Sequence, residues 1–362
     1  MGSVLSDKPT VAITAPHALS AAELASEIGR CGLLEPKHQP ALDLFAKQFT
    51  SAAVLADELV RRKIITSWQA RNLLSGERHF FLGEYRLLDH IATGGMGAVY
   101  KAAHHVRGKI VAIKVTTPEV DADPIARERF IREVRVLTAL DHPTIVKALG
   151  AVVEGEARYL VMEYVAGMDL WDRNRQLGPM PVPLVCECAR QTLAGLEYAR
   201  HFGVVHRDLK PSNLILADTG TSGAVLCKIL DLGLAGFSGG TGPGLTNMGE
   251  FIGTADYAAP EQARNAWIAD ARSDIYGLGM SMYELIAGRL PKLAKTAMEG
   301  LLLRARQEVP SIESCGKPLP EGFAAVLTKM LARKPSERFQ TPLETAKALS
   351  PFCGRFHNPA IK

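Results

Sequence analysis

Two short segments carry the residues best suited to chemistry: His-Arg-Asp-Leu-Lys-Pro-Ser-Asn, which ends at Asn213, and Asp-Leu-Gly, which begins at Asp231. Phosphoryl transfer asks little covalent chemistry of a protein. It needs a group that orients the attacking hydroxyl, ligands for a metal ion, and positive charge near the phosphate. Asp208 suits the first role and Lys210 the third. Asn213 and Asp231 offer the oxygen atoms that Mg²⁺ prefers.

Two segments upstream fit the same chemistry. Ile-Ala-Thr-Gly-Gly-Met-Gly-Ala-Val, residues 91–99, lies between two predicted strands, and its glycines let backbone N–H groups approach a phosphate closely. Val-Ala-Ile-Lys ends at Lys114 and alternates as a strand does, so Ala112 and Lys114 face one side. An acidic residue, Glu133, follows on a predicted helix.

Taken in order, these segments resemble the protein kinases, and most closely the bacterial, eukaryotic-like (Hanks-type) serine/threonine kinases. The resemblance covers about residues 85–352. It implies an enzyme that transfers the γ-phosphate of ATP to serine and threonine hydroxyls of protein substrates in signal transduction. The implied metal is Mg²⁺, with Mn²⁺ as an alternative. Lys210 specifically implies serine/threonine rather than tyrosine acceptors.

The resemblance also assigns roles to single residues. Asp208 would accept or orient the proton of the substrate hydroxyl, assisted by Lys210, while Asn213 and Asp231 would hold the metal. Lys114 would bind the α- and β-phosphates and pair with an acid on the next helix. The implied ATP-binding residues are Ile91, Ala92, Gly94, Gly97, Val99, Ala112, Lys114, Glu133, Met162, Glu163, Val165, Asp169 and Ile215. Of these, Glu163 and Val165 would bind the adenine through their backbones.

Two positions depart from the family pattern. Ala92 stands where the first glycine of the loop is usual, and Leu232 stands where phenylalanine follows the metal aspartate. Ala92 favours an alternative function, a pseudokinase that binds nucleotide and acts as a scaffold. The retained Lys114, Asp208 and Asp231 favour the active enzyme.

The segment after Asp231 is rich in glycine, and the resemblance makes it an activation segment. We expect phosphorylation, including autophosphorylation, at Thr246 or Thr241, with Arg207 pairing with the phosphate. Thr254 would help to seat the acceptor. Three further residues have expected structural roles. Glu261 and Arg338 would form an ion pair, and Asp274 would anchor the catalytic loop, residues 206–213, from below.

The arrangement of expected elements predicts a bilobal α+β architecture preceded by a small all-α domain. The resemblance makes the bilobal part a protein-kinase fold, with an antiparallel-sheet N-lobe that carries one helix and with a helical C-lobe. Strand-like runs at 86–90, 98–103, 110–116, 145–154 and 158–164, with one helix at 124–140, give way to helices after residue 166. The predicted domains are a flexible N-terminus (1–17), a helical leader (18–80), a kinase domain (85–352, N-lobe 85–165 and C-lobe 166–352) and a tail (353–362).

The helical leader carries apolar residues at helical spacing and two capping signals, Ser-Ala-Ala-Glu from Ser20 and Thr-Ser before Trp68. Its end resembles the leader of planctomycete kinases, from which no function follows. Two interpretations stay open. The leader docks a partner or packs on the kinase domain to regulate it, or it only stabilises the chain.

The composition excludes several classes of protein. Of 362 residues, 47% are hydrophobic and 22% charged, and the net charge of +4 with no basic tract argues against nucleic-acid binding. No secretory signal or transmembrane segment is evident in the sequence. The six cysteines show no metal or disulfide spacing. We expect a cytoplasmic protein with free thiols.

Overall fold

The computed structural model describes residues 19–94, 97–115, 134–154, 157–221, 224–232, 255–263, 268–291 and 297–354. The chain divides into two compact units, one with residues up to 91 and 100–110, the other with residues 92–99 and those from 111 onward. The predicted flexible N-terminus, residues 1–17, lies outside the described residues, as does most of the predicted tail.

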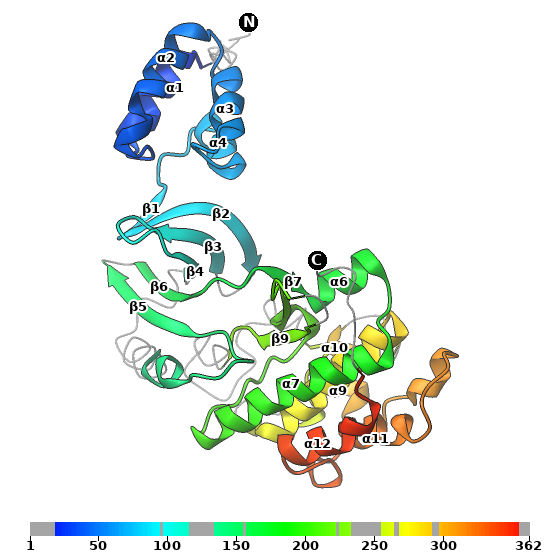
Figure 1. Cartoon of the computed structure of the whole chain (residues 1–362). Helices are drawn as coiled ribbons and strands as arrows, with labels where there is room; N and C mark the ends of the chain where they lie inside the picture. The colour runs from blue at the N-terminus through cyan, green and yellow to red at the C-terminus, as the bar shows by residue number, and fades with distance from the viewer. Residues whose placement is uncertain are drawn as a thin grey trace, which may run out of the picture. The chain divides into compact units, whose positions relative to one another are not determined.

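The described part of the first unit begins with a helical bundle (Figure 1). Its helices are α1 (Ala21–Arg30), α2 (Gln39–Gln48), α3 (Ala52–Arg61) and α4 (Ser67–Leu74), with a 3₁₀ turn at Pro36–His38. Their apolar faces form one core, which includes Leu24, Ile28, Leu42, Phe45, Leu55, Leu59 and Leu73. The predicted all-α leader is therefore confirmed, and so is the capping box of Ser20 and Glu23.

The residue after the C-cap of α3, Lys63, has a backbone conformation that favours glycine. Lys63 has a φ of 58°. Its N–H donates to Val60 O (2.8 Å), and the next N–H, of Ile64, donates to Leu59 O (2.9 Å). This pair of bonds is a Schellman motif, which needs a left-handed residue at the position of Lys63. A side chain there brings Cβ too close to the following carbonyl oxygen.

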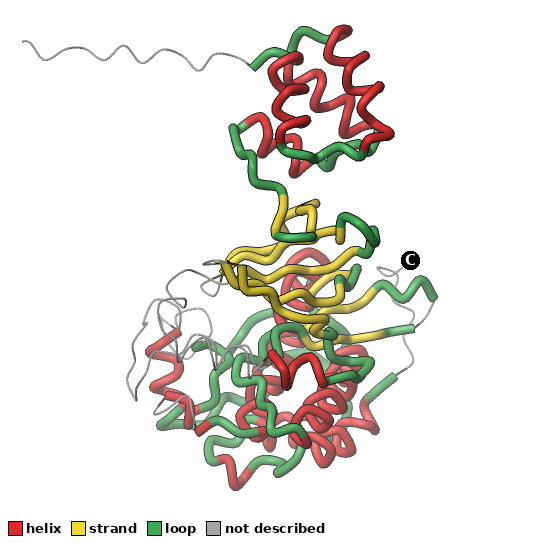
Figure 2. The backbone as a smooth tube through the Cα atoms, turned by 90° about the vertical axis from the view of Figure 1, so that its left-hand side faces the viewer, coloured by secondary structure: helices red, strands yellow, loops and turns green. Residues whose placement is uncertain are grey.

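Six strands form a sheet with the order β1-β2-β3-β4-β6-β5 among the described residues. They are β1 (Phe81–Leu82), β2 (Tyr85–Gly94), β3 (Gly97–His104), β4 (Ile110–Val115), β5 (Ala148–Glu154) and β6 (Ala157–Glu163). Figure 2 draws these strands in yellow. In the second unit β6 pairs antiparallel with β4 and with β5, and Ala112 lies opposite Met162. The predicted antiparallel sheet is confirmed.

A smaller antiparallel sheet brings distant segments together. It contains β7 (Gly167–Asp169), β8 (Leu214–Ala217) and β9 (Leu226–Ile229), in that order. In the β8–β9 hairpin Leu214 lies opposite Ile229. Just beyond this pair, the N–H of Leu230 donates to Asn213 O (2.9 Å). The segment before β8 and the segment after β9 therefore lie side by side.

Helices make up most of the remaining described residues. They are α6 (Leu170–Leu177), α7 (Val182–His201), α9 (Ala271–Ala287), α10 (Ala297–Arg304), α11 (Phe323–Met330) and α12 (Pro342–Leu349). Single 3₁₀ turns lie at Pro211–Asn213, Pro260–Ala263, Ile312–Cys315, Pro335–Glu337 and Ser350–Phe352. Helix α9 is buried along nearly its whole length and contacts α7, α11 and α12. This agrees with its apolar sequence, which predicts a core helix.

The boundaries of some elements differ from expectation. The strand predicted from residue 145 begins at Ala148, because Ile145 instead bridges in parallel to Ile229. In the leader, α2 starts at Gln39, directly after the 3₁₀ turn at Pro36–His38. Pro40 stands in its first turn, where the missing N–H costs nothing. Of the helix expected at 124–140, residues 134–139 are described and helical.

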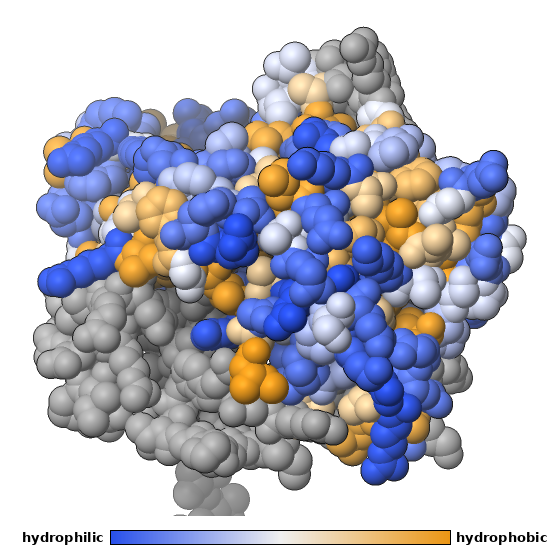
Figure 3. All heavy atoms as spheres, turned by 90° about the horizontal axis from the view of Figure 1, so that it is seen from below, coloured by the Kyte–Doolittle hydropathy of each residue, from blue (hydrophilic) through white to orange (hydrophobic). Residues whose placement is uncertain are grey.

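One face of the molecule shows how apolar and hydrophilic side chains are mixed on the surface. On the face drawn in Figure 3, hydrophilic side chains separate the apolar ones into small groups. Across the described ranges, none of the helices combines the length and the apolar character that a membrane crossing requires.

Lys63→Gly is expected to stabilise the bundle by about 0.5–1 kcal/mol, since glycine adopts the left-handed conformation without strain and this gain exceeds its extra entropy loss. Native-state hydrogen exchange of the α3 amides measures the change. Lys47→Gly, in the last turn of α2, is the control and should destabilise instead. Slower exchange in the control, or faster exchange in Lys63→Gly, would contradict the prediction.

Candidate active site

A buried carboxylate on α9 holds the segment that carries Asp208. Asp274 is only 3% exposed. Its Oδ2 accepts the backbone N–H of His206 (2.9 Å) and its Oδ1 that of Arg207 (2.8 Å). Burial raises the pKa of Asp274, although the backbone N–H groups of His206 and Arg207 and the charge of Arg207 act to lower it. Gly277, one turn further along α9, allows close approach, since a Cβ there would lie 2.9 Å from Leu209 O.

His206 links this segment to the one that contains Asp231. The ring is 1% exposed, and Nε2 lies 3.0 Å from Leu230 O. Its Nδ1 accepts the N–H of Asp208 (3.3 Å). One ring nitrogen therefore donates and the other accepts, as in a neutral histidine protonated at Nε2. The ring fixes both Asp208 and the residue before Asp231.

The two oxygens of Asp208 have different surroundings. Oδ2 lies 2.9 Å from Lys210 Nζ and accepts a 3.3 Å bond from Asn213 Nδ2. Asn213 Nδ2 also donates to the backbone oxygen of Asp208 (2.7 Å). Oδ1 is buried and has no hydrogen-bond partner among the described residues. An acceptor of this kind, left open beside a fixed cation, is suited to an incoming hydroxyl.

Asp231 and Lys114 form an ion pair. Lys114 on β4 is 7% exposed, and its Nζ lies 2.8 Å from Asp231 Oδ2. The sequence assigned Lys114 to phosphates and to Glu133, so this partner was missed. Glu133 lies outside the described residues. Asp231 Oδ1 receives no hydrogen bond from the described part of the chain.

Two residues of the site have an unusual backbone. Arg207 has a φ of 67° and Asp231 a φ of 52°, a region that few residues other than glycine adopt. A side chain from a distant segment binds the backbone of Arg207. Gln262 Nε2 donates to Arg207 O (2.9 Å), and its Oε1 accepts the N–H of Ala259 (2.8 Å). Strain of this kind accumulates at functional sites.

The segment from Met162 to Asp169 contains the expected adenine-binding residues. Glu163 N–H donates to Lys147 O (2.9 Å), so this group is not open to a ligand. Its side chain pairs with Lys228 (2.5 Å). The N–H and C=O of Val165 make no hydrogen bond within the described residues. Asp169 caps α6 by accepting the N–H of Asp172 (2.9 Å).

The remaining expected ATP-binding residues lie on strands. Ile91, Ala92 and Gly94 are at the end of β2, Gly97 and Val99 at the start of β3, and Ile215 on β8 opposite Asp169. Gly97 has a φ of 122°. Ile91 and Ala92 are both exposed. Ala112 and Met162 are buried neighbours across the β4–β6 ladder.

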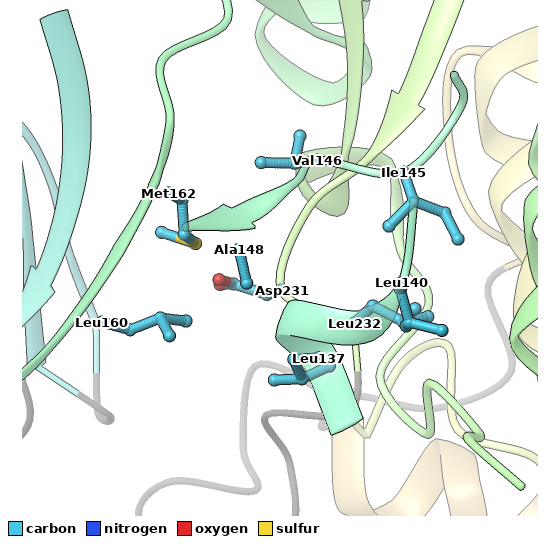
Figure 4. Close-up of a pocket in the computed structure, with 9 residues that line it drawn as sticks. All are labelled: Leu137, Leu140, Ile145, Val146, Ala148, Leu160, Met162, Asp231 and Leu232. Atoms are coloured by element: carbon cyan, nitrogen blue, oxygen red, sulfur yellow. The ribbon is translucent and has the colours of Figure 1, made fainter. Parts of the chain in front are cut away.

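A small pocket lies beside Asp231 (Figure 4). Asp231 brings the charged group to a lining that is otherwise aliphatic apart from Met162: Leu137, Leu140, Ile145, Val146, Ala148, Leu160 and Leu232. Leu137 of this lining comes from the described end of the helix expected at 124–140. The aliphatic lining lowers the polarity on this side of Asp231, which strengthens the attraction of its carboxylate for cations.

The segment from Ala255 to Glu261 is fastened by buried charges. Arg338 is fully buried in its side chain and binds Glu261 through two bonds of 2.8 Å each. It also donates to the carbonyls of Arg272, Ala332 and Arg333. Burial by itself raises the pKa of Glu261, but the bonds from Arg338 and Ser273 hold it below its ordinary value.

Several contacts of this segment were not predicted. Tyr257 OH donates to Glu284 Oε2 (2.5 Å), and burial raises the pKa of Glu284. Arg304 on α10 is 3% exposed and donates to Ala255 O. The sequence signal for Arg304 is weak, because its partner is a backbone oxygen. Thr241, Thr246 and Thr254 lie outside the described residues.

Comparisons with known proteins point to the same region. The protein kinase domain family matches residues 85–349. The serine/threonine-protein kinase PrkC of Bacillus subtilis (strain 168) is 32% identical over 269 residues, which is 74% of this chain and 40% of that protein. The serine/threonine-protein kinase PknB of Mycobacterium tuberculosis (strain ATCC 25618 / H37Rv) is 33% identical over 264 residues, 72% of this chain and 41% of that protein. The chain spans about two fifths of the length of these curated relatives.

Solved structures resemble the chain over the same span. The crystal structure of the Mycobacterium tuberculosis PknI kinase domain has a TM-score of 0.58 at 25% identity, covering 75% of this chain and 98% of that one. The crystal structure of Rad53 1-466 in complex with AMP-PNP has a TM-score of 0.60 at 26% identity, covering 75% of this chain and 66% of that one.

Asp274→Asn is expected to cost about 1–3 kcal/mol, because an amide can accept only one of the two buried N–H groups. Hydrogen exchange of the amides of His206 and Arg207 should accelerate accordingly. Asp270→Asn, at the cap of the same helix, is the control, since asparagine caps helices as well as aspartate does. Unchanged exchange at His206 in Asp274→Asn would refute the anchor.

Arg338→Met is expected to destabilise the chain by about 3–5 kcal/mol, because it leaves the carboxylate of Glu261 buried without its cation. This difference in the free energy of unfolding should narrow as the pH falls through the lowered pKa of Glu261. Below that pKa the carboxyl is neutral in both proteins, and no unpaired charge is left. Urea denaturation at several pH values measures both effects. Lys334→Met, which removes an exposed ion pair with Glu337, should cost at most about 0.5 kcal/mol. Equal costs for the two variants would count against the prediction.

Proposed function

The chain belongs to the protein kinase domain family, and on that premise we propose that it is a serine/threonine kinase that uses ATP to phosphorylate proteins. The observation that carries the proposal is the arrangement around Asp208. Its Oδ1 is buried and accepts no hydrogen bond from the described residues, and its Oδ2 is held by Lys210 and Asn213. A base fixed in this way can orient a hydroxyl for in-line attack.

Each polar group has a task in the proposed reaction. Asp208 Oδ1 accepts the hydrogen bond of the acceptor hydroxyl and takes its proton as the hydroxyl oxygen bonds to the γ-phosphorus. The bond from that phosphorus to the bridging oxygen breaks in the same transfer, and ADP leaves. Lys210, already beside Asp208, supplies positive charge close to the transferred group. Lys114 brings a second positive charge from β4. These cations stabilise charge that spreads over the phosphoryl oxygens during transfer.

The residues at hand fit a divalent cation such as Mg²⁺, with Mn²⁺ as an alternative. Asn213 commits its amide nitrogen to Asp208, which leaves its oxygen as a ligand, and Asp231 Oδ1 is open within the described residues. No three His, Cys, Asp or Glu side chains of the described ranges gather as a complete metal centre. This suits Mg²⁺, which usually takes one or two protein ligands and completes its shell with phosphates and water. When bound, the ion neutralises phosphate charge.

For the nucleotide, we propose that the glycine-rich turn between β2 and β3, within residues 91–99, binds the phosphates. The segment from Met162 to Asp169 would bind the adenine and the ribose. The open backbone groups of Val165 support base recognition. The contribution of Glu163 is limited to its carbonyl, because its N–H is already bonded to Lys147 O. Val99, Ala112 and Met162 provide the apolar surface on which an adenine ring would lie.

Regulation is proposed on sequence grounds. Phosphorylation of Thr246 or Thr241, including autophosphorylation, would order the segment through Arg207, and Thr254 would seat the acceptor. Both activating threonines changed to alanine should lower activity, and phosphosite mapping after incubation with ATP identifies the residue. We further propose a regulatory or docking partner for the leader, which resembles that of planctomycete kinases. A cytoplasmic setting is supported by the use of ATP and by six free cysteines.

Asp208→Asn is expected to lower phosphate transfer by about 10²–10⁴-fold while ATP affinity changes little, because only the proton acceptor is lost. Transfer of labelled γ-phosphate to a basic protein and to the chain itself measures the rate, and calorimetry measures affinity.

Asp141→Asn, which alters an exposed ion pair with Lys147, is the matched control and should leave transfer unchanged. Full activity of Asp208→Asn would overturn the assigned base. Wild-type chain that binds ATP without any transfer would instead support the pseudokinase suggested by Ala92.

A further inference from the structure

The N-terminus of α4 is attached directly to strand β2. Thr66 and Gln69 form a capping box, in which Thr66 Oγ1 accepts the N–H of Gln69 (3.1 Å) and Gln69 Oε1 accepts the N–H of Thr66 (2.9 Å). The box uses only the acceptors of these side chains. Their remaining donors both bind β2: Thr66 Oγ1 donates to Leu88 O (2.5 Å) and Gln69 Nε2 to Leu87 O (2.6 Å).

Trp68, between these two residues in sequence, extends the contact to β3. Its ring lies edge-on to Phe80 and to Tyr100, with centroids 5.9 Å apart in both pairs. Tyr100 in turn lies edge-on to His90 of β2 (5.4 Å). Edge-to-face pairs at these distances are favourable. One helix end thus contacts both strands that lead to the glycine-rich turn.

A second attachment to β2 comes from the segment that follows α1. Arg86 of β2 donates to Leu33 O (3.1 Å) and lies 3.7 Å from Glu35. Arg78, in the connection after α4, pairs with Glu27 of α1 (2.6 Å). Gln69 is only 2% exposed, so its bond to Leu87 is shielded from water. Shielded bonds of this kind are costly to break, because the carbonyl is left without a partner.

The bundle and the strand segments that it contacts belong to the same compact unit. The bundle, residues 85–91 of β2 and residues 100–104 of β3 belong to one unit, while residues 92–99 belong to the other. The glycine-rich turn therefore continues, through its own backbone, from strand segments that are packed with the bundle. What orders these segments also restricts the two ends of the turn.

We propose that α4 is a positioning element for the glycine-rich turn, with Thr66, Trp68 and Gln69 acting through β2 and β3. The inference rests on the proposed function, because it assumes that the turn binds nucleotide phosphates. None of the three residues is a catalytic residue. Holding both strands in place before ATP arrives reduces the ordering cost of binding, so the bundle tunes ATP affinity more than the rate of transfer.

Gln69→Glu isolates the contact to β2. Glutamate keeps the capping box, but it replaces the N–H donor with a carboxylate that faces Leu87 O. In the full-length chain, we expect hydrogen-exchange protection of residues 85–104 to fall about tenfold, with α1–α3 unchanged. The KM for ATP should rise about three- to tenfold, and kcat should stay within about twofold.

Two variants serve as controls. Gln48→Glu makes the same charge change at an exposed position of the bundle, and Thr66→Ser keeps the hydroxyl. Both should match wild type. Wild-type exchange in residues 85–104 together with a wild-type KM for ATP in Gln69→Glu would overturn the proposal. So would a fall in kcat with an unchanged KM.

The failure of the kinase proposal has a different signature. If the wild-type chain binds Mg-ATP without transferring phosphate, the proposed activity fails, and the dissociation constant of Mg-ATP replaces KM as the readout. A weaker affinity of Gln69→Glu then supports the positioning role, and an equal affinity refutes it. Loss of helical circular dichroism in Gln69→Glu would also refute it, since the capping box is expected to survive.

Discussion

The carboxylate of Asp274 is the constraint on which the rest of the site depends. It binds two successive backbone N–H groups, and with them it sets where the chain turns into the catalytic loop. His206 then carries the constraint across to Leu230 and so to Asp231. A residue with no chemical task thereby places the carboxylate that receives the hydroxyl and the carboxylate that would hold a cation. The helix that carries Asp274, α9, is buried along nearly its whole length, and close packing resists displacement of such a helix.

The chemistry-bearing residues could be named from the sequence because their types and spacing are distinctive. All four of them, Asp208, Lys210, Asn213 and Asp231, fall within two short loops, and the β8–β9 hairpin brings these loops together. The anchoring of backbone N–H groups by Asp274 was foreseen, but contacts to backbone carbonyls were not. Gln262 and Arg304 bind carbonyls of distant residues, and any residue could offer a carbonyl. The bonded N–H of Glu163 was missed for the same reason.

The leader illustrates a similar limit. Helical spacing and capping signals gave its helices and its core, because both depend on residues that are close in sequence. The packing of the leader on β2 uses two side-chain donors that the capping box does not need, those of Thr66 and Gln69. Those donors carry no periodic signal, and their partners are again carbonyls. The same residues therefore read as a local helix start in the sequence and as a tertiary contact in the structure.

The left-handed backbone of Asp231 also bears on how such a chain drifts over evolutionary time. Asparagine and glycine both suit a φ of 52° at least as well as aspartate does. A change to either would relieve the backbone, but it would also remove the negative charge that pairs with the buried Lys114. The two effects on stability oppose each other. Drift at this position is therefore tied to position 114, because losing the aspartate alone leaves a buried ammonium without its partner.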